Sequence, residues 1–328
     1  MRLRRALRAS TRTIVTAAVF CCGISAVAHA AAERGTVIRT VNIYVAPDAS
    51  SAKLATTERG REAVVLDRVN GWVHVIATLM DAAYNPDPEA PNTRNVTGWI
   101  VDRDYISEAT PKGDQILFGE AADCEDEASR SHGRKGAAGD ARRLYYRVFD
   151  LFPKSPLAGE ALYRAADIQW QLDKEDMRTR PSYRNAPPSE RPQIDEQAMK
   201  LVHKKFPGTK WADMAAYEIL DNKMCGDWAG SSKCPEKEAE VYEHYAADHP
   251  NSPNAAEALY NAAYRWAAAI TIYEGEGQSK RAPEAQKRAI ADAQKALDKN
   301  ASPEWNARAE RLLYMVQKGV PVYGSGVD

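Results

Sequence analysis

The chain has 328 residues, of which 44 are basic, 45 are acidic and 44% are hydrophobic. That length is sufficient for two domains of about 100–200 residues each. The balance of charge lacks the basic excess that binding to a phosphate backbone requires, which argues against a nucleic-acid partner.

The first thirty residues are predicted to be a secretory signal. Five arginines open the chain: Arg2, Arg4, Arg5, Arg8 and Arg12. An apolar, acid-free segment from Ile14 to Val27 follows, and Ala28-His29-Ala30 supplies the small residues of a cleavage site. The alternative is an uncleaved anchor, but fourteen weakly apolar residues are fewer than the roughly 20 that span a membrane. We therefore expect cleavage after Ala30, a periplasmic or exported protein, and no membrane span after cleavage.

Removal of this signal leaves 39 basic and 45 acidic residues, a formal charge of −6, and three cysteines. In an oxidising compartment, Cys225 and Cys234 are predicted to form a disulfide around a small loop, which leaves Cys124 unpaired. The alternatives are that the three thiols are independent or pair differently.

Residues 36–108 contain short apolar patches separated by turn residues, the pattern of a small β-barrel or sandwich. The patches are Val41–Val45, Arg61–Leu66, Gly71–Ile76 and Gly98–Val101. Gly60 and the pair Asn70-Gly71 occupy positions where tight turns need a positive φ.

This region resembles the bacterial SH3 domain. The resemblance is carried, in order, by Asn42, Pro47, Gly60, Asn70-Gly71-Trp72, Val75, Gly98-Trp99 and Tyr105-Ile106. It implies a binding module, directed in many relatives at cell-wall peptide or glycan and in others at proteins. Two features depart from the family. Tyr44 stands where relatives often have arginine, and residues 79–96 form an inserted loop rich in Pro and Asp.

The aromatic residues of this region are the candidate binding residues. Trp72 and Trp99 are predicted to form a platform for a ligand, and the alternative is that they are structural tryptophans of the barrel. Tyr44, Tyr84 and Tyr105 are further candidates. The inserted loop is either a recognition loop or a tolerated insertion.

Beyond residue 108 the apolar pattern becomes helical. We expect a linker and leading helix over 109–138, helical repeats over 139–318, and a tail over 319–328. Three segments align without a gap: Phe152–Tyr163, Phe206–Tyr217 and His249–Tyr260. A partial fourth segment, Ser302–Ala307, is expected to be a terminal cap.

Each aligned segment predicts the end of one helix and the start of the next. Ser155, Thr209 and Ser252 are expected to be N-caps, with Pro156 and Pro253 at the first helical positions. The segments resemble tetratricopeptide repeats, and among them those of two periplasmic groups. One is the Tol-Pal-associated coordinator protein, and the other is the helical lipoprotein of the outer-membrane barrel-assembly machinery.

The repeat spacing of 54 and then 43 residues exceeds the near-34 of the family. The extra residues fall in three inserts, at 178–193, 225–234 and 273–283, each after the first helix of a pair. We expect all three on one edge of the helical array, where they either frame a partner site or reflect drift at a tolerant edge.

The sequence contains no triad, metal-ligand or phosphate-loop motif, so we expect neither catalysis, a cofactor nor a metal. The predicted fold is multi-domain, a small all-β SH3-like barrel followed by an all-α tetratricopeptide-like solenoid. The expected function is that of an exported cell-envelope scaffold. Its expected partners are an envelope protein or peptide, with peptidoglycan as a further candidate. The alternatives are an outer-membrane assembly or division accessory acting through the helices alone, and a cell-wall hydrolase accessory.

Overall fold

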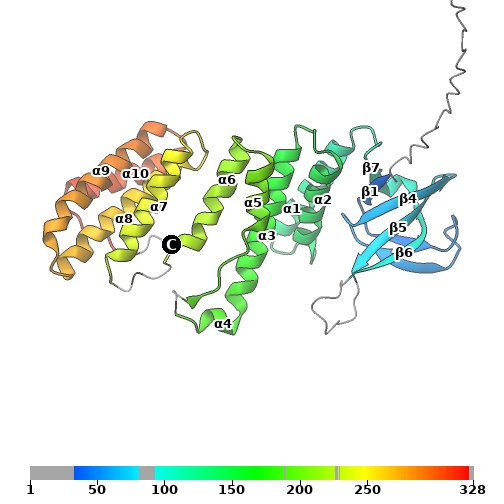
Figure 1. Ribbon diagram of the computed structural model, residues 1–328, viewed down its shortest axis with the longest axis horizontal. Helices are drawn as coiled ribbons and strands as arrows, with labels where there is room; N and C mark the ends of the chain where they lie inside the picture. The colour runs from blue at the N-terminus through cyan, green and yellow to red at the C-terminus, as the bar shows by residue number, and fades with distance from the viewer. Residues whose placement is uncertain (1–32, 81–92, 188–189, 226–227, 229, 325–328) are drawn as a thin grey trace, which may run out of the picture. The chain divides into compact units, whose positions relative to one another are not determined.

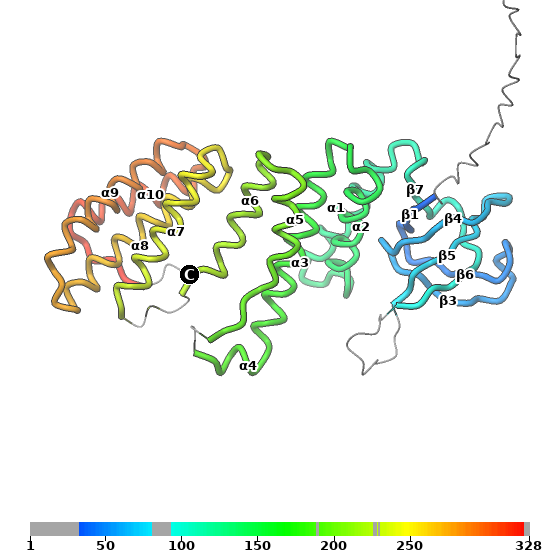
Figure 2. The backbone as a smooth tube through the Cα atoms, viewed as in Figure 1, coloured from blue at the N-terminus to red at the C-terminus, as the bar shows by residue number. Residues whose placement is uncertain are grey.

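A computed structural model describes residues 33–80, 93–187, 190–225, 228 and 230–324 (Figures 1 and 2). The predicted signal over 1–30 and the candidate residue Tyr84 lie outside these residues. Among the described residues, an antiparallel sheet comes first and ten α-helices follow. The coarse prediction of a β region followed by a helical region is confirmed.

The β region is one curled sheet of seven strands in the order β3-β2-β6-β5-β4-β1-β7 (Figure 2). Every pairing is antiparallel. The strands are β1 (Arg34–Val37), β2 (Val41–Tyr44), β3 (Lys53–Thr57), β4 (Glu62–Val69), β5 (Trp72–Met80), β6 (Thr93–Val101) and β7 (Tyr105–Ser107), with the short helix η1 (Asp102–Asp104) before the last.

Side-chain alternation explains how the sheet buries one of its faces. Val73, Val75 and Ala77 of β5 are fully buried, whereas the residues between them are partly exposed. Such alternation is expected of a strand with one face on a core. The predicted turn conformations are confirmed, because Gly60, Asn70 and Gly71 all have positive φ.

The helical region consists of helices of 3 to 22 residues, most of which pack against a neighbour in the chain (Figure 1). They are α1 (Gly113–Ser129), α2 (Ala137–Leu151), α3 (Ala158–Thr179), α4 (Pro181–Arg184), α5 (Gln197–Lys205), α6 (Lys210–Glu218), η3 (Ile219–Lys223), α7 (Lys233–Asp248), α8 (Ala255–Gly275), η4 (Ser279–Arg281), α9 (Ala282–Lys299) and α10 (Pro303–Gln317).

Of the three predicted N-caps, Thr209 is correct, and Ser155 and Ser252 are wrong. Thr209 and Ser302 are N-caps whose side chains accept hydrogen bonds from the backbone N–H three residues on. Ser155 and Ser252 instead accept from the residue two positions on, within a turn that precedes the helix. Helices α3 and α8 therefore begin at Ala158 and Ala255, so the prolines at 156 and 253 lie before the first turn rather than in it.

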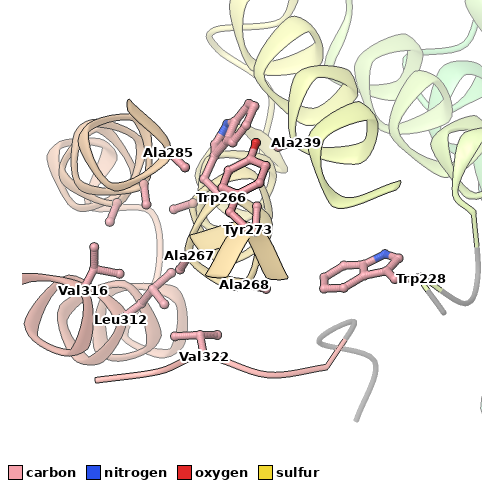
Figure 3. Packing of buried hydrophobic residues seen from close by; sticks show 14 residues of the cluster. Trp228, Ala239, Trp266, Ala267, Ala268, Tyr273, Ala285, Leu312, Val316 and Val322 are labelled. Atoms are coloured by element: carbon pink, nitrogen blue, oxygen red, sulfur yellow. The ribbon is translucent and has the colours of Figure 1, made fainter. Parts of the chain in front are cut away.

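The C-terminal core forms around α8, which is rich in alanine (Figure 3). Trp266 and Tyr273 of this helix are at most 4% exposed and pack with Leu312 and Val316 of α10. Alanines such as Ala263 and Ala267, both in the same cluster, add little bulk, so neighbouring helices can approach α8 closely.

The sheet and the first helices share a core. Ile38 and Ile106 of the β region belong to the same buried cluster as Leu117 of α1 and Leu144 of α2. Arg143 Nε of α2 donates a hydrogen bond of 2.8 Å to the carbonyl oxygen of Arg59. The β region and the leading helices are thus joined by packing and by polar contacts, in addition to the chain itself.

Gly60 allows the sheet and α2 to approach closely. Arg147 Nε donates a hydrogen bond of 3.1 Å to the Gly60 carbonyl oxygen, and a Cβ atom on this glycine would lie 2.5 Å from Arg143 Cβ. No side chain can occupy that space without a shift of α2.

Candidate functional site

Four aromatic side chains come together on the solvent side of the sheet. They belong to three adjacent strands and are Tyr44 of β2, Trp72 and His74 of β5, and Trp99 of β6. The register pairs Trp99 with both Tyr44 and His74. Trp72 and His74 share a face because they are two residues apart in one strand. We refer to these four residues as the aromatic face.

The rings of the aromatic face are in direct contact. Tyr44 and Trp72 meet edge to face with ring centroids 5.7 Å apart, and His74 stacks on Trp99 at 4.6 Å. Asn42 Nδ2 donates a hydrogen bond of 3.3 Å to the Tyr44 hydroxyl. All four aromatic residues are partly exposed, so their rings support one another and still reach solvent.

Gly98 explains why β2 can lie so close to β6 here. A Cβ atom on Gly98 would be 2.6 Å from both Ile43 Cγ2 and the Tyr44 carbonyl oxygen. The glycine therefore lets the two strands pack tightly, and the next residue, Trp99, is directed to the aromatic face. The Gly98-Trp99 pair thus has a physical role in building this face.

The aromatic face can offer broad, partly apolar ring surfaces with few charges. Tyr and Trp combine apolar area with a polar atom, which suits ligands that are themselves amphipathic. The β region also exposes large apolar side chains at Val45, Leu54, Leu66 and Val69.

The structure brings together three of the five predicted binding residues. Tyr44, Trp72 and Trp99 meet on the aromatic face, whereas Tyr105 is only 5% exposed and donates a hydrogen bond to the Ala63 carbonyl oxygen. Burial raises the pKa of Tyr105 well above the usual value. Tyr105 is therefore a core residue of the sheet. His74 was not among the predicted residues, although its spacing from Trp72 in an alternating strand indicates the same face.

A second candidate site is a cavity of about 280 Å³ at the edge formed by the inserts. Its lining includes Arg178, Tyr183 and Arg191 of the first insert, Cys225 of the second, and Arg265 of α8. We refer to it as the insert cavity. The second insert also contacts the third, since Ser232 N donates a hydrogen bond of 3.0 Å to Glu276 Oε1. These contacts place the three inserts along one edge.

A buried ion pair forms part of the wall of the insert cavity. Arg265 Nε lies 2.8 Å from Glu238 Oε2, and the two residues are 5% and 2% exposed. The Arg265 guanidinium also lies over the Tyr242 ring, 4.6 Å from its centroid. The backbone N–H of Cys225 donates a hydrogen bond of 2.7 Å to Glu238 Oε1, which ties the second insert to this pair.

The structure pairs Cys225 and Cys234 in a disulfide with a Cα–Cα distance of 5.9 Å. Cys124 is free and buried, and Arg59 Nη1 lies 3.1 Å from its sulfur. Within the described part of the chain, no group of three or more His, Cys, Asp or Glu side chains is placed to hold a metal ion. Over the same residues, no helix combines the length and apolar character needed to cross a membrane.

Comparison with known proteins identifies no family for this chain. No protein-family description and no curated protein matches the sequence. The similar solved structures include the DHF58 filament, with 19% identity, 62% of this chain and 91% of that chain covered, and a TM-score of 0.23. They also include the de novo designed helical repeat protein DHR64, with 17% identity, coverage of 64% and 95%, and a TM-score of 0.22. At such TM-scores we draw nothing from these likenesses.

Proposed function

We propose that this protein is an exported, non-catalytic adaptor of the bacterial cell envelope. In this proposal the sheet is an SH3-like module that binds the cell wall or a wall-associated protein, and the helices are tetratricopeptide-like repeats that hold a partner peptide. The observation that carries the proposal is the aromatic face, where Tyr44, Trp72, His74 and Trp99 meet outside the core. The secretory signal predicted over 1–30 supports the proposed location in the cell envelope.

The aromatic face fits a wall ligand in its chemistry. Ligand sites are mostly lined by apolar and aromatic side chains, with a few polar groups that set orientation. Here the ring faces of Trp72 and Trp99 would supply apolar contact, and the Tyr44 hydroxyl and the His74 ring would supply hydrogen bonds. Glycan rings and short peptides both present the mixed apolar and polar surface that such a site recognises.

The test is co-sedimentation of the chain from residue 31 onward with purified peptidoglycan. We expect the wild-type protein to sediment with the wall, and the Trp72→Ala/Trp99→Ala variant to lose at least about 90% of binding, since each ring carries large contact area. The matched control is Tyr146→Ala, which removes a 41% exposed aromatic residue from α2. Pull-down from an envelope extract with the same three proteins tests the wall-associated partner. If neither wall nor any envelope protein is retained by the wild-type chain, the proposal is wrong.

The alternative function uses the helices alone, with the sheet as a structural element. The shared core of Ile106 with Leu117 favours a structural contribution of the sheet. Deleting residues 36–108 cannot separate the two functions, because it would expose Leu117 as well as remove the aromatic face. The Trp72→Ala/Trp99→Ala variant does separate them. A cell in which this variant fully replaces the wild-type protein without a phenotype would support the alternative.

A wall-hydrolysing accessory is distinguished by activity. The adaptor proposal expects no clearing of a gel that contains cell wall. Clearing by the purified protein would contradict it.

A further inference from the structure

We propose that the insert cavity binds a carboxylate side chain of an acidic peptide segment in a partner protein. This inference rests on the proposed adaptor function and states the chemistry of the partner that the helices hold. The juxtaposition that carries it is a buried, partly unused arginine, Arg265, in the wall of a cavity that Arg178 and Arg191 also line.

Arg265 has hydrogen-bonding capacity left within the cavity. Its Nε is paired with Glu238, and its Nη1 donates to the carbonyl oxygen of Asn261 at 3.2 Å. Among the residues that the structure describes, none accepts a hydrogen bond from Arg265 Nη2. Arg265 is only 5% exposed as a residue and lines the cavity, and a charged donor in such a wall can form a charge-assisted hydrogen bond to an anionic ligand.

Arg191 contributes a second donor of the same kind. Its Nε atom is buried and has no partner among the described residues, while its guanidinium lies over the Tyr183 ring at 5.0 Å from the centroid. The stacking holds the planar group in place, so less side-chain freedom is lost when a carboxylate binds. Arg178, also in the lining, is exposed and takes part in no ion pair with another described residue.

The first insert is basic although the chain as a whole is not. Residues 178–193 contain four arginines and one glutamate, whereas residues 31–328 have a formal charge of −6. Of these arginines, Arg180 is neutralised by an ion pair with Asp176. A basic patch on an otherwise acidic molecule attracts acidic partners and repels basic ones, so it confers selectivity by charge.

The size and walls of the cavity fit a side chain better than a cofactor. Small-molecule sites usually occupy about 300–1,000 Å³, and this cavity holds about 280 Å³. Met177, Met224 and Tyr242 add apolar wall next to the arginines. A glutamate, with a short hydrocarbon stem and a terminal carboxylate, presents both kinds of surface. An acidic segment would place one such side chain in the cavity and others near the basic insert.

The experiment measures binding of a fluorescent peptide of alternating glutamate and leucine to the full mature chain by anisotropy at low salt. We expect saturable binding that weakens as salt increases. The same peptide with glutamine in place of glutamate should not bind. The Arg178→Gln/Arg191→Gln variant should bind at least about tenfold more weakly, because two charge-assisted contacts are lost. Its matched control is Arg103→Gln/Arg130→Gln, which removes two exposed arginines elsewhere and should leave affinity unchanged.

Several outcomes overturn the inference. Equal affinity of the glutamate and glutamine peptides would show that charge is not recognised. Equal weakening by both double-arginine variants would show a non-specific effect of net charge. Full displacement of the peptide by an equimolar oligonucleotide or inorganic phosphate would indicate a general anion site. The Trp72→Ala/Trp99→Ala variant should bind the peptide normally. If the wild-type protein binds the wall but not the peptide, the insert cavity is refuted and the proposed function is not.

Discussion

Glycine at position 60 contributes to the contact between the sheet and the helices. Gly60 and Gly71 both have positive φ, but only Gly60 has a neighbour, Arg143, within reach of a new Cβ atom. A side chain at Gly71 would therefore have only the conformational cost of positive φ, whereas one at Gly60 would also have the steric cost of a clash with Arg143.

We predict that Gly71→Ala lowers the free energy of unfolding by about 1–2 kcal/mol, the usual cost of a side chain at positive φ. Gly60→Ala should cost clearly more, about 3 kcal/mol or above, because α2 must also shift away from the new methyl group. Urea denaturation of both variants measures the difference. Equal losses would contradict the close contact at Gly60.

The buried Arg265–Glu238 ion pair should be sensitive to the loss of either charge. Arg265→Met should destabilise the protein by about 3–5 kcal/mol, because it leaves a carboxylate buried without its partner. Replacing both residues, with Arg265→Met and Glu238→Leu, should cost less than Arg265→Met alone, since no unpaired charge remains. A double-mutant cycle by chemical denaturation checks this. Additive losses would mean that the two charges do not interact.

Among the helices, the contact between α3 and α6 contains acidic groups that should respond to pH. Burial, together with the charges of Asp167 and Asp221, raises the pKa of Glu218 from 4.5 to about 7. Between these two values the folded protein keeps a proton that the unfolded chain releases. The free energy of unfolding should therefore fall as pH rises from about 4.5 to about 7.

We predict that Glu218→Gln removes this loss. The variant should be more stable than the wild-type protein at pH 8, by at most about 3 kcal/mol, and equally stable at pH 4. Denaturation curves at the two pH values measure the effect, with Glu310→Gln as a control at an exposed site of α10. A gain of the same size at both pH values would show that ionisation is not its cause.

The disulfide joins Cys225, which follows η3, to Cys234 in the first turn of α7. Cys225 and Cys234 are separated by nine positions, so the closed loop is short and the expected stabilisation is about 2–3 kcal/mol. The Cys225→Ser/Cys234→Ser variant should show this loss and should no longer respond to a reductant. Thermal unfolding with and without reductant measures it. A peptide map that finds both cysteines separately alkylated without reduction would contradict the pairing.

The change in apolar period predicted the order of sheet and helices. Gly60 and the Asn70-Gly71 pair predicted two turns, and the tryptophans Trp72 and Trp99, each of which follows a glycine, predicted much of the aromatic face. The short strands β1, β3 and β7 were not predicted, because three to five residues have no clear alternation and their place depends on pairing with distant strands. The starts of α3 and α8 were misplaced because a serine before a proline is compatible with either a cap or a turn. The insert cavity could not be predicted, since it depends on Arg265 reaching Glu238 across two helices.

For the whole molecule, the shared core of the sheet and the first helices has a measurable effect. Removing residues 33–108 should expose Leu117 of α1 and lower the protection of α1 and α2 in hydrogen exchange. Protection in α8 and α9 should change little, because their cluster contains no residue of the sheet or of α1 and α2. Hydrogen exchange followed by mass spectrometry measures the protection of α1 and α2 and of α8 and α9 in the full and the shortened chain. Unchanged protection in α1 and α2 would show that the helices do not depend on the sheet.

The pairing of β1 with β7 joins two parts of the chain that are far apart in the sequence. Gly35 pairs with Ser107, so the sheet cannot be completed until a segment more than 70 residues further along the chain is available. Most later helices, in contrast, pack against a neighbour that is close in the sequence. We therefore expect completion of the sheet to be slower than packing of the later helices. Until β7 pairs, one edge of β1 is open, and an open strand edge is a site at which another chain can pair and aggregate.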